Sequence, residues 1–290
     1  MKKILAAVTA AAVLLTLTAC SSRTEQITAT AENTQTTTAE TTQPAPLWEW
    51  QHDSPDNQGL NSGVLDDIHS TFDSFDLLSS AIVKNGYIVD EYYKEDYDGN
   101  SLFLLHSASK SITSALVGIA IDKGYIESVD TPIAEYFPQL AQKDDPRWSR
   151  ITVRHLLTHT SGIDCGDTEF EDAWRASDNW IEFVLSRPMA YEPGEVFNYS
   201  TGNTHLLTAI LEQATGMTEL DFGMQYLFEP MDIENVRIDT DAQGVSDGGN
   251  GIWLTPYDLA KIGLLYMNGG VWEGEQLIPQ QWIEDSTSSV

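Results

Sequence analysis

The amino-acid sequence predicts an α+β fold, in which an antiparallel sheet is flanked by helices. Two observations predict it. Residues 79–93 contain two β-prone runs joined by Asn85 and Gly86, the dipeptide that best fits a two-residue hairpin turn. From residue 107 onward, apolar residues recur at helical spacing in six segments, near residues 107–123, 154–158, 179–186, 204–214, 220–228 and 256–267.

The hairpin needs further strands, because a two-stranded sheet is marginally stable in water and its edges are open to pairing. No comparable alternating run follows Gly270. We therefore expect the domain in this sequence to be C-terminally incomplete, with the missing strands beyond residue 290. We also expect this form, expressed alone, to be poorly stable or nearly inactive.

The helix predicted over residues 256–267 has the clearest start. Thr255 stands at its N-cap, Pro256 at its first position and Asp258 three residues after the cap, which is a capping-box pattern. The chain is thus rich in helices, and its 41% of hydrophobic residues is ample for the core of one large domain.

The first residues predict an exported protein. Residues 1–19 combine Lys2 and Lys3 with an apolar run that is shorter than the about 20 residues of a membrane-spanning helix. Their Leu-Thr-Ala-Cys ending resembles a bacterial lipobox, which implies cleavage before Cys20 and a lipid on its sulfur. The alternative is an ordinary secretory cleavage site with Cys20 as an incidental thiol. Residues 20–46 are expected to be a disordered, Thr-rich tether, and residues 47–290 form the domain.

The charge of the chain excludes one class of partner. Lys and Arg total 15 against 44 Asp and Glu, so the formal net charge is −29. Nucleic-acid phosphates need basic surfaces, so we expect no nucleic-acid partner. An acidic surface also binds anionic lipid poorly, and the expected membrane attachment is therefore through the N-terminal lipid only. The simplest role of the acidity is to keep an exported protein soluble.

Ser107 and Lys110 are the candidate catalytic residues. They are three residues apart at the start of a predicted helix, which places them on one face. An amine that is shielded from water near the positive end of a helix loses its proton more readily and can activate a serine hydroxyl. The backbone N–H of Ser107 can donate one of the two hydrogen bonds that an oxyanion needs. The alternative is that Ser107 caps the helix and Lys110 is solvated.

Two other chemistries are weaker candidates. His155 and His159 are four residues apart, as in a zinc pair, but the Glu and the third ligand of a metalloprotease helix are absent nearby. Cys165 lies in an acidic turn that raises rather than lowers the pKa of a thiol, which disfavours a catalytic cysteine. We therefore expect neither a metal nor another cofactor.

Four stretches then occur in the order of one family, at residues 107–111, 156–162, 193–200 and 254–261. With them the chain resembles the serine β-lactamase and penicillin-binding protein superfamily, in the branch of class C β-lactamases, D-aminopeptidases, carboxylesterases and 6-aminohexanoate-dimer hydrolases. The resemblance implies a β-lactamase/transpeptidase-like fold with a helical subdomain. It also implies that Tyr199 is the second base, facing Ser107 and Lys110. The run Leu-Leu-Thr-His-Thr-Ser-Gly at residues 156–162 looks structural in this family.

The chain departs from the family pattern at two places. Many relatives have Tyr-x-Asn, whereas this chain has Tyr199, Ser200 and Thr201, with Asn203 displaced by two residues. No Lys-Thr-Gly or His-x-Gly motif follows Tyr199. The resemblance therefore implies a serine hydrolase that cleaves an ester or amide of a small molecule or short peptide, including a β-lactam or D-peptide. The alternative is a penicillin-binding or sensor-type protein with little or no turnover.

Overall fold

The computed structural model describes residues 48–166 and 168–289 of the chain. They belong to the unit that spans Pro46–Val290. The expected signal peptide, the lipidated Cys20 and the Thr-rich tether lie outside the described residues. In the part that is described, no helix has the length and apolarity needed to cross a membrane.

The predicted hairpin is confirmed, and it forms two of the three strands of one sheet. Strands β2 (Ser79–Lys84) and β3 (Tyr87–Tyr93) pair in antiparallel fashion. Their turn has Asn85 at φ 52° and Gly86 at φ 84°, the left-handed values that favour this dipeptide. β1 (Gln51–His52) adds to the other side of β3, in parallel, so the sheet has the order β1-β3-β2.

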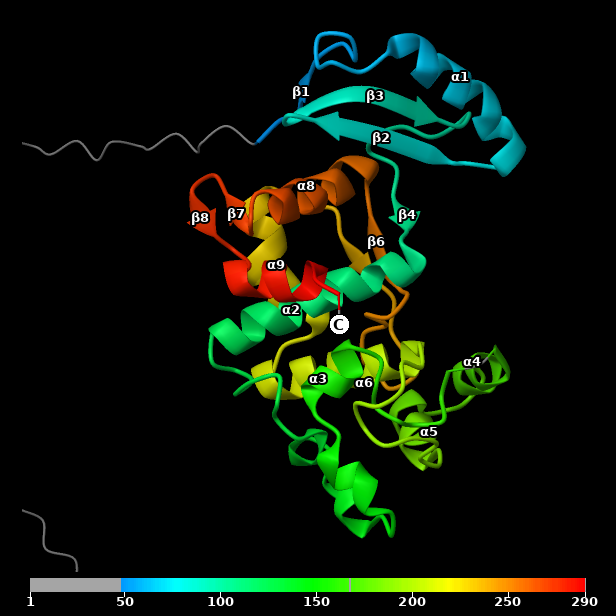
Figure 1. Cartoon of the computed structure of the whole chain (residues 1–290), viewed down its shortest axis with the longest axis vertical. Helices are drawn as coiled ribbons and strands as arrows, with labels where there is room; N and C mark the ends of the chain where they lie inside the picture. Colours follow the sequence, from blue (N-terminus) through cyan, green and yellow to red (C-terminus); the bar gives the residue numbers. More distant parts are fainter. Residues whose placement is uncertain (1–47, 167, 290) are drawn as a thin grey trace, which may run out of the picture. The chain divides into compact units, whose positions relative to one another are not determined.

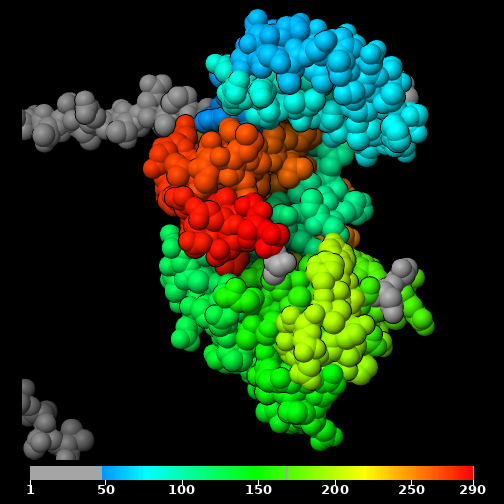
Figure 2. Space-filling view, viewed as in Figure 1, coloured from blue at the N-terminus to red at the C-terminus, as the bar shows by residue number. Residues whose placement is uncertain are grey.

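Helices cover both sides of this sheet (Figure 1). On one side, α1 (Ser62–Phe72) contacts β3 through a 2.8 Å hydrogen bond between His69 and Asp90. On the other side lies α8 (Pro256–Met267), which packs against β2. In the space-filling view, the orange surface of α8 is directly below the cyan surface of the sheet (Figure 2). As predicted, Thr255 caps α8, since its hydroxyl accepts from the backbone N–H of Asp258 at 3.1 Å.

Short strands connect the sheet region to the helices. β4 (Phe103–Leu104), β6 (Ile252–Leu254) and β5 (Arg237–Ile238) form a second sheet in the order β4-β6-β5. β7 (Val271–Trp272) and β8 (Glu275–Gln276) form a two-stranded ribbon. β4 leads into α2 (Ser109–Asp122), so the second sheet determines where α2 begins.

The helical part of the fold is built around α6 (Thr201–Thr215), which is buried over its first three turns. α2, α3, α4 and α5 all pack against α6. Five of the six predicted helical segments match α2, α3, α5, α6 and α8 within a few residues; the sixth becomes α7 followed by a π-helical turn at Met224–Phe228. The remaining bounds are α3 Val153–Leu157, α4 Thr168–Arg175, α5 Trp180–Ser186, α7 Glu219–Gly223 and α9 Gln280–Thr287.

The α+β fold, with an antiparallel hairpin beside helices and a separate helical region, is thus confirmed. β1 was not predicted, because two polar residues carry no alternating pattern. α1, α4 and α9 were also not predicted, and α1 has no buried residue. The expectation of further strands beyond residue 290 stays a prediction.

Candidate active site

Ser107 lies at the junction between β4 and α2. It is the middle residue of a short 3₁₀ turn, His106–Ala108, which runs directly into α2. His106 has a φ of 48°, a left-handed value that non-glycine residues rarely adopt. Strained backbone of this kind is typical of functional sites, where the surrounding structure holds it in place. Here it turns the chain so that the Ser107 side chain is exposed to solvent.

Lys110 approaches Ser107 within hydrogen-bond distance. Its Nζ is 3.1 Å from Ser107 Oγ, 2.7 Å from the carbonyl oxygen of Gly249 and 3.3 Å from Thr201 Oγ1. These contacts come from three separate segments of the chain. The alternative of a capping serine and a solvated lysine is therefore wrong, because the N-cap of α2 is Ala108 and no side chain caps the helix.

Tyr199, the third predicted residue, lies beside this lysine. Lys110 Nζ is 5.0 Å from the centroid of the Tyr199 ring, a cation–π distance. The tyrosine is 45% exposed, so one side of its ring faces solvent. The structure therefore brings Ser107, Lys110 and Tyr199 together at one solvent-accessible place.

His159 packs against the ring of Tyr199 and positions it. The two rings have centroids 4.7 Å apart, and His159 Nδ1 accepts the backbone N–H of Ser200 at 3.2 Å. Burial, followed by the positive charge of Lys110, lowers the pKa of His159 to about 4. His159 is thus neutral at pH 7, as its role as a hydrogen-bond acceptor requires.

The run at residues 156–162 has the structural role that the family resemblance implied. The carbonyl oxygen of His159 accepts from the N–H of Asn198 at 2.8 Å, and that of Gly162 accepts from Ala190 at 2.8 Å. Gly162 has a φ of 79°, and a Cβ there would lie 2.4 Å from the backbone oxygen of Tyr191. Only glycine fits this close approach. The run thereby fixes the loop that carries Tyr199.

The structure also shows what replaces the family asparagine. Thr201, two residues after Tyr199, contacts Lys110, whereas Asn203 is buried and points away from it. The Oδ1 atom of Asn203 accepts from Ser161 Oγ at 3.0 Å and from Cys165 Sγ at 3.7 Å. Cys165 is thus buried.

Thr201 and Gly249 were not identified as site residues from the sequence. The position of Thr201 two residues after Tyr199 was a usable signal for it. Gly249 contributes only a carbonyl oxygen, and no side-chain pattern reports such a contact.

His155 and His159 serve different purposes. His155 Nδ1 is 3.1 Å from the backbone nitrogen of Thr152 and completes the capping box of α3. His159 instead faces Tyr199. Within residues 48–166 and 168–289, no group of three or more potential ligands could hold a metal ion.

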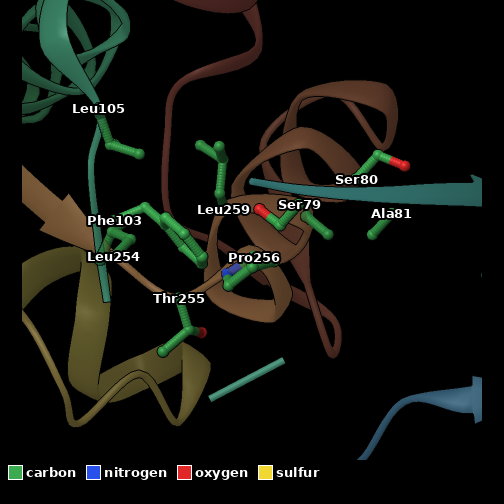
Figure 3. A pocket seen from close by; sticks show the side chains of 10 residues that line it. Ser79, Ser80, Ala81, Phe103, Leu105, Leu254, Thr255, Pro256 and Leu259 are labelled. Atoms are coloured by element: carbon green, nitrogen blue, oxygen red, sulfur yellow. The ribbon is translucent and has the colours of Figure 1, made fainter. Parts of the chain in front are cut away.

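One cavity lies next to this site without including it. It has a volume of about 230 Å³ and is bordered by β2, β4, β6 and the start of α8. Figure 3 shows Phe103, Leu254 and Leu259 among the side chains that line it, together with Ser79. Leu105, which also lines it, is two residues before Ser107.

Comparisons with known proteins identify the family of the chain. The family model described as Beta-lactamase matches residues 78–289, most of the chain, and the protein therefore belongs to the beta-lactamase family. The chain is 28% identical, over 223 residues, to the 6-aminohexanoate-dimer hydrolase of Paenarthrobacter ureafaciens, covering 70% of this chain and 55% of that one. It is 29% identical, over 146 residues, to the beta-lactamase of Escherichia coli K12, covering 50% and 37% respectively.

A solved structure shows the same fold. The octameric penicillin-binding protein homologue from Pyrococcus abyssi superposes with a TM-score of 0.61 at 21% identity, covering 78% of this chain and 59% of that chain. The chain spans about half the length of the curated hydrolase, 55%. The solved structure thus shows the fold, and the family membership rests on the family model.

Proposed function

We propose that the protein is a serine hydrolase that cleaves an ester or amide through an acyl-enzyme on Ser107. The observation that carries the proposal is the distance of 3.1 Å between Lys110 Nζ and Ser107 Oγ, with the amine held by two further oxygens. A serine needs such a base, because its hydroxyl is a weak nucleophile on its own.

The contacts of Lys110 suit it to be that base. A neutral amine has two hydrogens and one lone pair. If the hydrogens are donated to the Gly249 carbonyl and Thr201 Oγ1, the lone pair points toward Ser107 Oγ. Lys110 then takes the serine proton as Oγ bonds to the substrate carbonyl carbon. The backbone N–H of Ser107, at the start of α2, donates to the resulting oxyanion.

Tyr199 completes the proton path in this proposal. Its ring is 5.0 Å from Lys110 Nζ and is partly exposed. The proton taken from Ser107 passes from Lys110 by way of Tyr199 to the leaving alcohol or amine. The bond between the acyl carbon and this leaving group breaks at the same time. Water then attacks the ester on Ser107, returning the serine and releasing the acid.

The substrate class rests on the relatives and on the exposure of the site. The 6-aminohexanoate-dimer hydrolase and the Escherichia coli beta-lactamase are both named for hydrolysis. Ser107 and Tyr199 are exposed, which suits a small molecule or a short peptide that binds from solvent. We propose substrates of this kind, including β-lactams and D-amino-acid peptides.

Labelling with a fluorophosphonate tests the nucleophile. The probe loses fluoride and forms a phosphonyl ester with the serine oxygen, which intact-mass and peptide mass spectrometry locate. We expect modification of Ser107 in the wild type and none there in Ser107→Ala. Ser111→Ala is the matched control, since Ser111 is exposed one turn further along α2. Labelling that survives in Ser107→Ala at the wild-type rate contradicts the assignment.

A binding or sensing role is the second candidate, and one observation favours it. The family asparagine is absent from the site, where Thr201 contacts Lys110 instead. The two candidates differ in the fate of the acyl group. After incubation with benzylpenicillin, a hydrolase releases the acid and returns to its unmodified mass, whereas a sensor keeps a lasting adduct on Ser107.

We also propose that the protein is exported and anchored to the bacterial membrane by a lipid on Cys20. The support is the sequence of residues 1–20 alone. Mass spectrometry of the mature N-terminus tests it. A lipidated Cys20 is expected in the wild type, and Cys20→Ser should release the protein from the membrane fraction; an unlipidated N-terminus contradicts the anchor.

A further inference from the structure

A buried glutamate lies behind the active site and has no role in the mechanism above. Glu219 is the first residue of α7, and its side chain is fully shielded from solvent. Its Oε1 is 2.6 Å from Thr113 Oγ1, and the same threonine oxygen is 2.7 Å from the carbonyl oxygen of Gly248. Among the described residues, Glu219 Oε2 has no hydrogen-bond partner.

These distances determine where the proton lies. The Thr113 hydroxyl has one hydrogen, yet two oxygens are within hydrogen-bond distance of it. If Glu219 is ionised, both of these are acceptors and one of them must go without a donor. If Glu219 is protonated, its O–H donates to Thr113, and Thr113 donates to the Gly248 carbonyl. Only the protonated form satisfies both contacts.

The surroundings of Glu219 favour the same form. Burial raises the pKa of Glu219 to about 8, and the negative charges of Glu212 and Asp247 act in the same direction, against the Thr113 hydrogen bond. Glu212 accepts from the backbone N–H of Glu219 at 3.0 Å. Asp247 is partly neutralised by Arg175 at 3.4 Å. Among the described residues, no cation contacts the Glu219 carboxyl directly.

The chain of contacts ends at the catalytic lysine. Gly248 precedes Gly249, whose carbonyl oxygen accepts from Lys110 Nζ at 2.7 Å. Thr113 is one helical turn after Lys110 on α2, and Ser109 Oγ accepts from the backbone N–H of Ile252 at 3.2 Å. The first turns of α2 therefore hold the segment 248–252 at three successive points.

We propose that protonated Glu219 is a positioning residue: through Thr113 it fixes the Gly248 and Gly249 backbone, so that the Gly249 carbonyl holds the Lys110 amine against Ser107. The inference rests on the proposed function of Ser107 and Lys110. Glu219 touches neither the substrate nor the reacting atoms.

Two pairs of variants test it, with the rate of fluorophosphonate labelling at Ser107 as the readout. Glu219→Gln keeps an uncharged donor to Thr113 and should stay within about twofold of the wild-type rate, whereas Glu219→Leu should lose about tenfold. Thr113→Ser keeps the hydroxyl and Thr113→Val removes it, with the same expected contrast. Far-UV circular dichroism identifies any variant that fails to fold, and the other pair then decides.

The pH profile separates positioning from general stability. Deprotonation of Glu219 breaks the chain of hydrogen bonds. The labelling rate of the wild type should therefore fall as the pH rises, with a midpoint at about pH 8, and this fall should be absent from Glu219→Gln. Equal rates for folded Glu219→Leu and wild type overturn the positioning role and leave the proposed function intact. A folded wild type that is never labelled at Ser107 overturns both.

Discussion

At the scale of single residues, Gly248 is required by packing rather than by backbone conformation. A Cβ at this position would lie 2.4 Å from Glu219 Oε2 and 2.5 Å from both Thr113 Oγ1 and Thr208 Oγ1. All three atoms belong to fully buried side chains, so none can move away freely. We expect Gly248→Ala to lower the free energy of unfolding by about 1–3 kcal/mol, as other overpacked sites do.

Gly263 offers the matched control for this prediction. It lies in the middle of α8, and a Cβ there would meet nothing within 4 Å. Gly263→Ala should raise the free energy of unfolding by about 0.5–1 kcal/mol, because alanine favours the helix. Urea unfolding followed by circular dichroism measures both. Similar effects of the two substitutions would contradict the packing around Gly248.

The residues that the sequence predicted and missed differ in kind. Ser107, Lys110 and Tyr199 could be predicted because their side chains do the proposed chemistry and their spacing repeats a known pattern. His159 was first considered as a metal ligand, since its pairing with Tyr199 depends on a loop that returns from 40 residues away. Glu219 and Gly249 act through buried and backbone oxygens. Such long-range contacts leave no local pattern.

At the scale of elements, α9 packs closely across α2. A Cβ on Gly118 would lie 2.4 Å from Cδ2 of the Trp282 indole, so the glycine lets α9 approach. Gly118→Ala should therefore lower the thermal midpoint, although alanine favours a helix. The rigid ring cannot yield without moving α9. A differential scanning measurement beside Gly263→Ala tests this, and a rise in both midpoints would show that α9 is loosely attached.

The elements that were predictable have strong local signals. The hairpin has Asn85 and Gly86 at its turn, and α8 has Thr255 as its cap. The short strands β4, β5 and β6 have two or three residues each and are defined by pairing between distant segments. No pattern of alternation can be read over such lengths. The fold class was therefore accessible from the sequence, but the second sheet that places Ser107 was not.

At the scale of the whole molecule, His159 and Glu219, two buried titrating groups near the site, have opposite effects on the pH dependence of stability. The folded pKa of His159 is about 4, below its ordinary 6.5. The folded state thus binds fewer protons between these values, and the stability from this group falls as pH drops from 6.5 toward 4. The folded pKa of Glu219 is about 8, above its ordinary 4.5. The stability from this group is highest below 4.5 and falls as pH rises toward 8.

Together these groups place the maximum stability in the mildly acidic range. We expect the thermal midpoint to peak between about pH 4.5 and 6.5, a window bounded by the ordinary pKa values of the two groups.

Two variants separate the two sides of this profile. Glu219→Gln should flatten the alkaline side, since it carries no proton to lose. His159→Asn should flatten the acidic side, because asparagine tolerates the left-handed φ of 55° and does not titrate. Thermal midpoints from pH 4 to 9 at fixed ionic strength measure each effect. An alkaline slope that stays unchanged in Glu219→Gln would show that Glu219 is not held protonated behind Lys110.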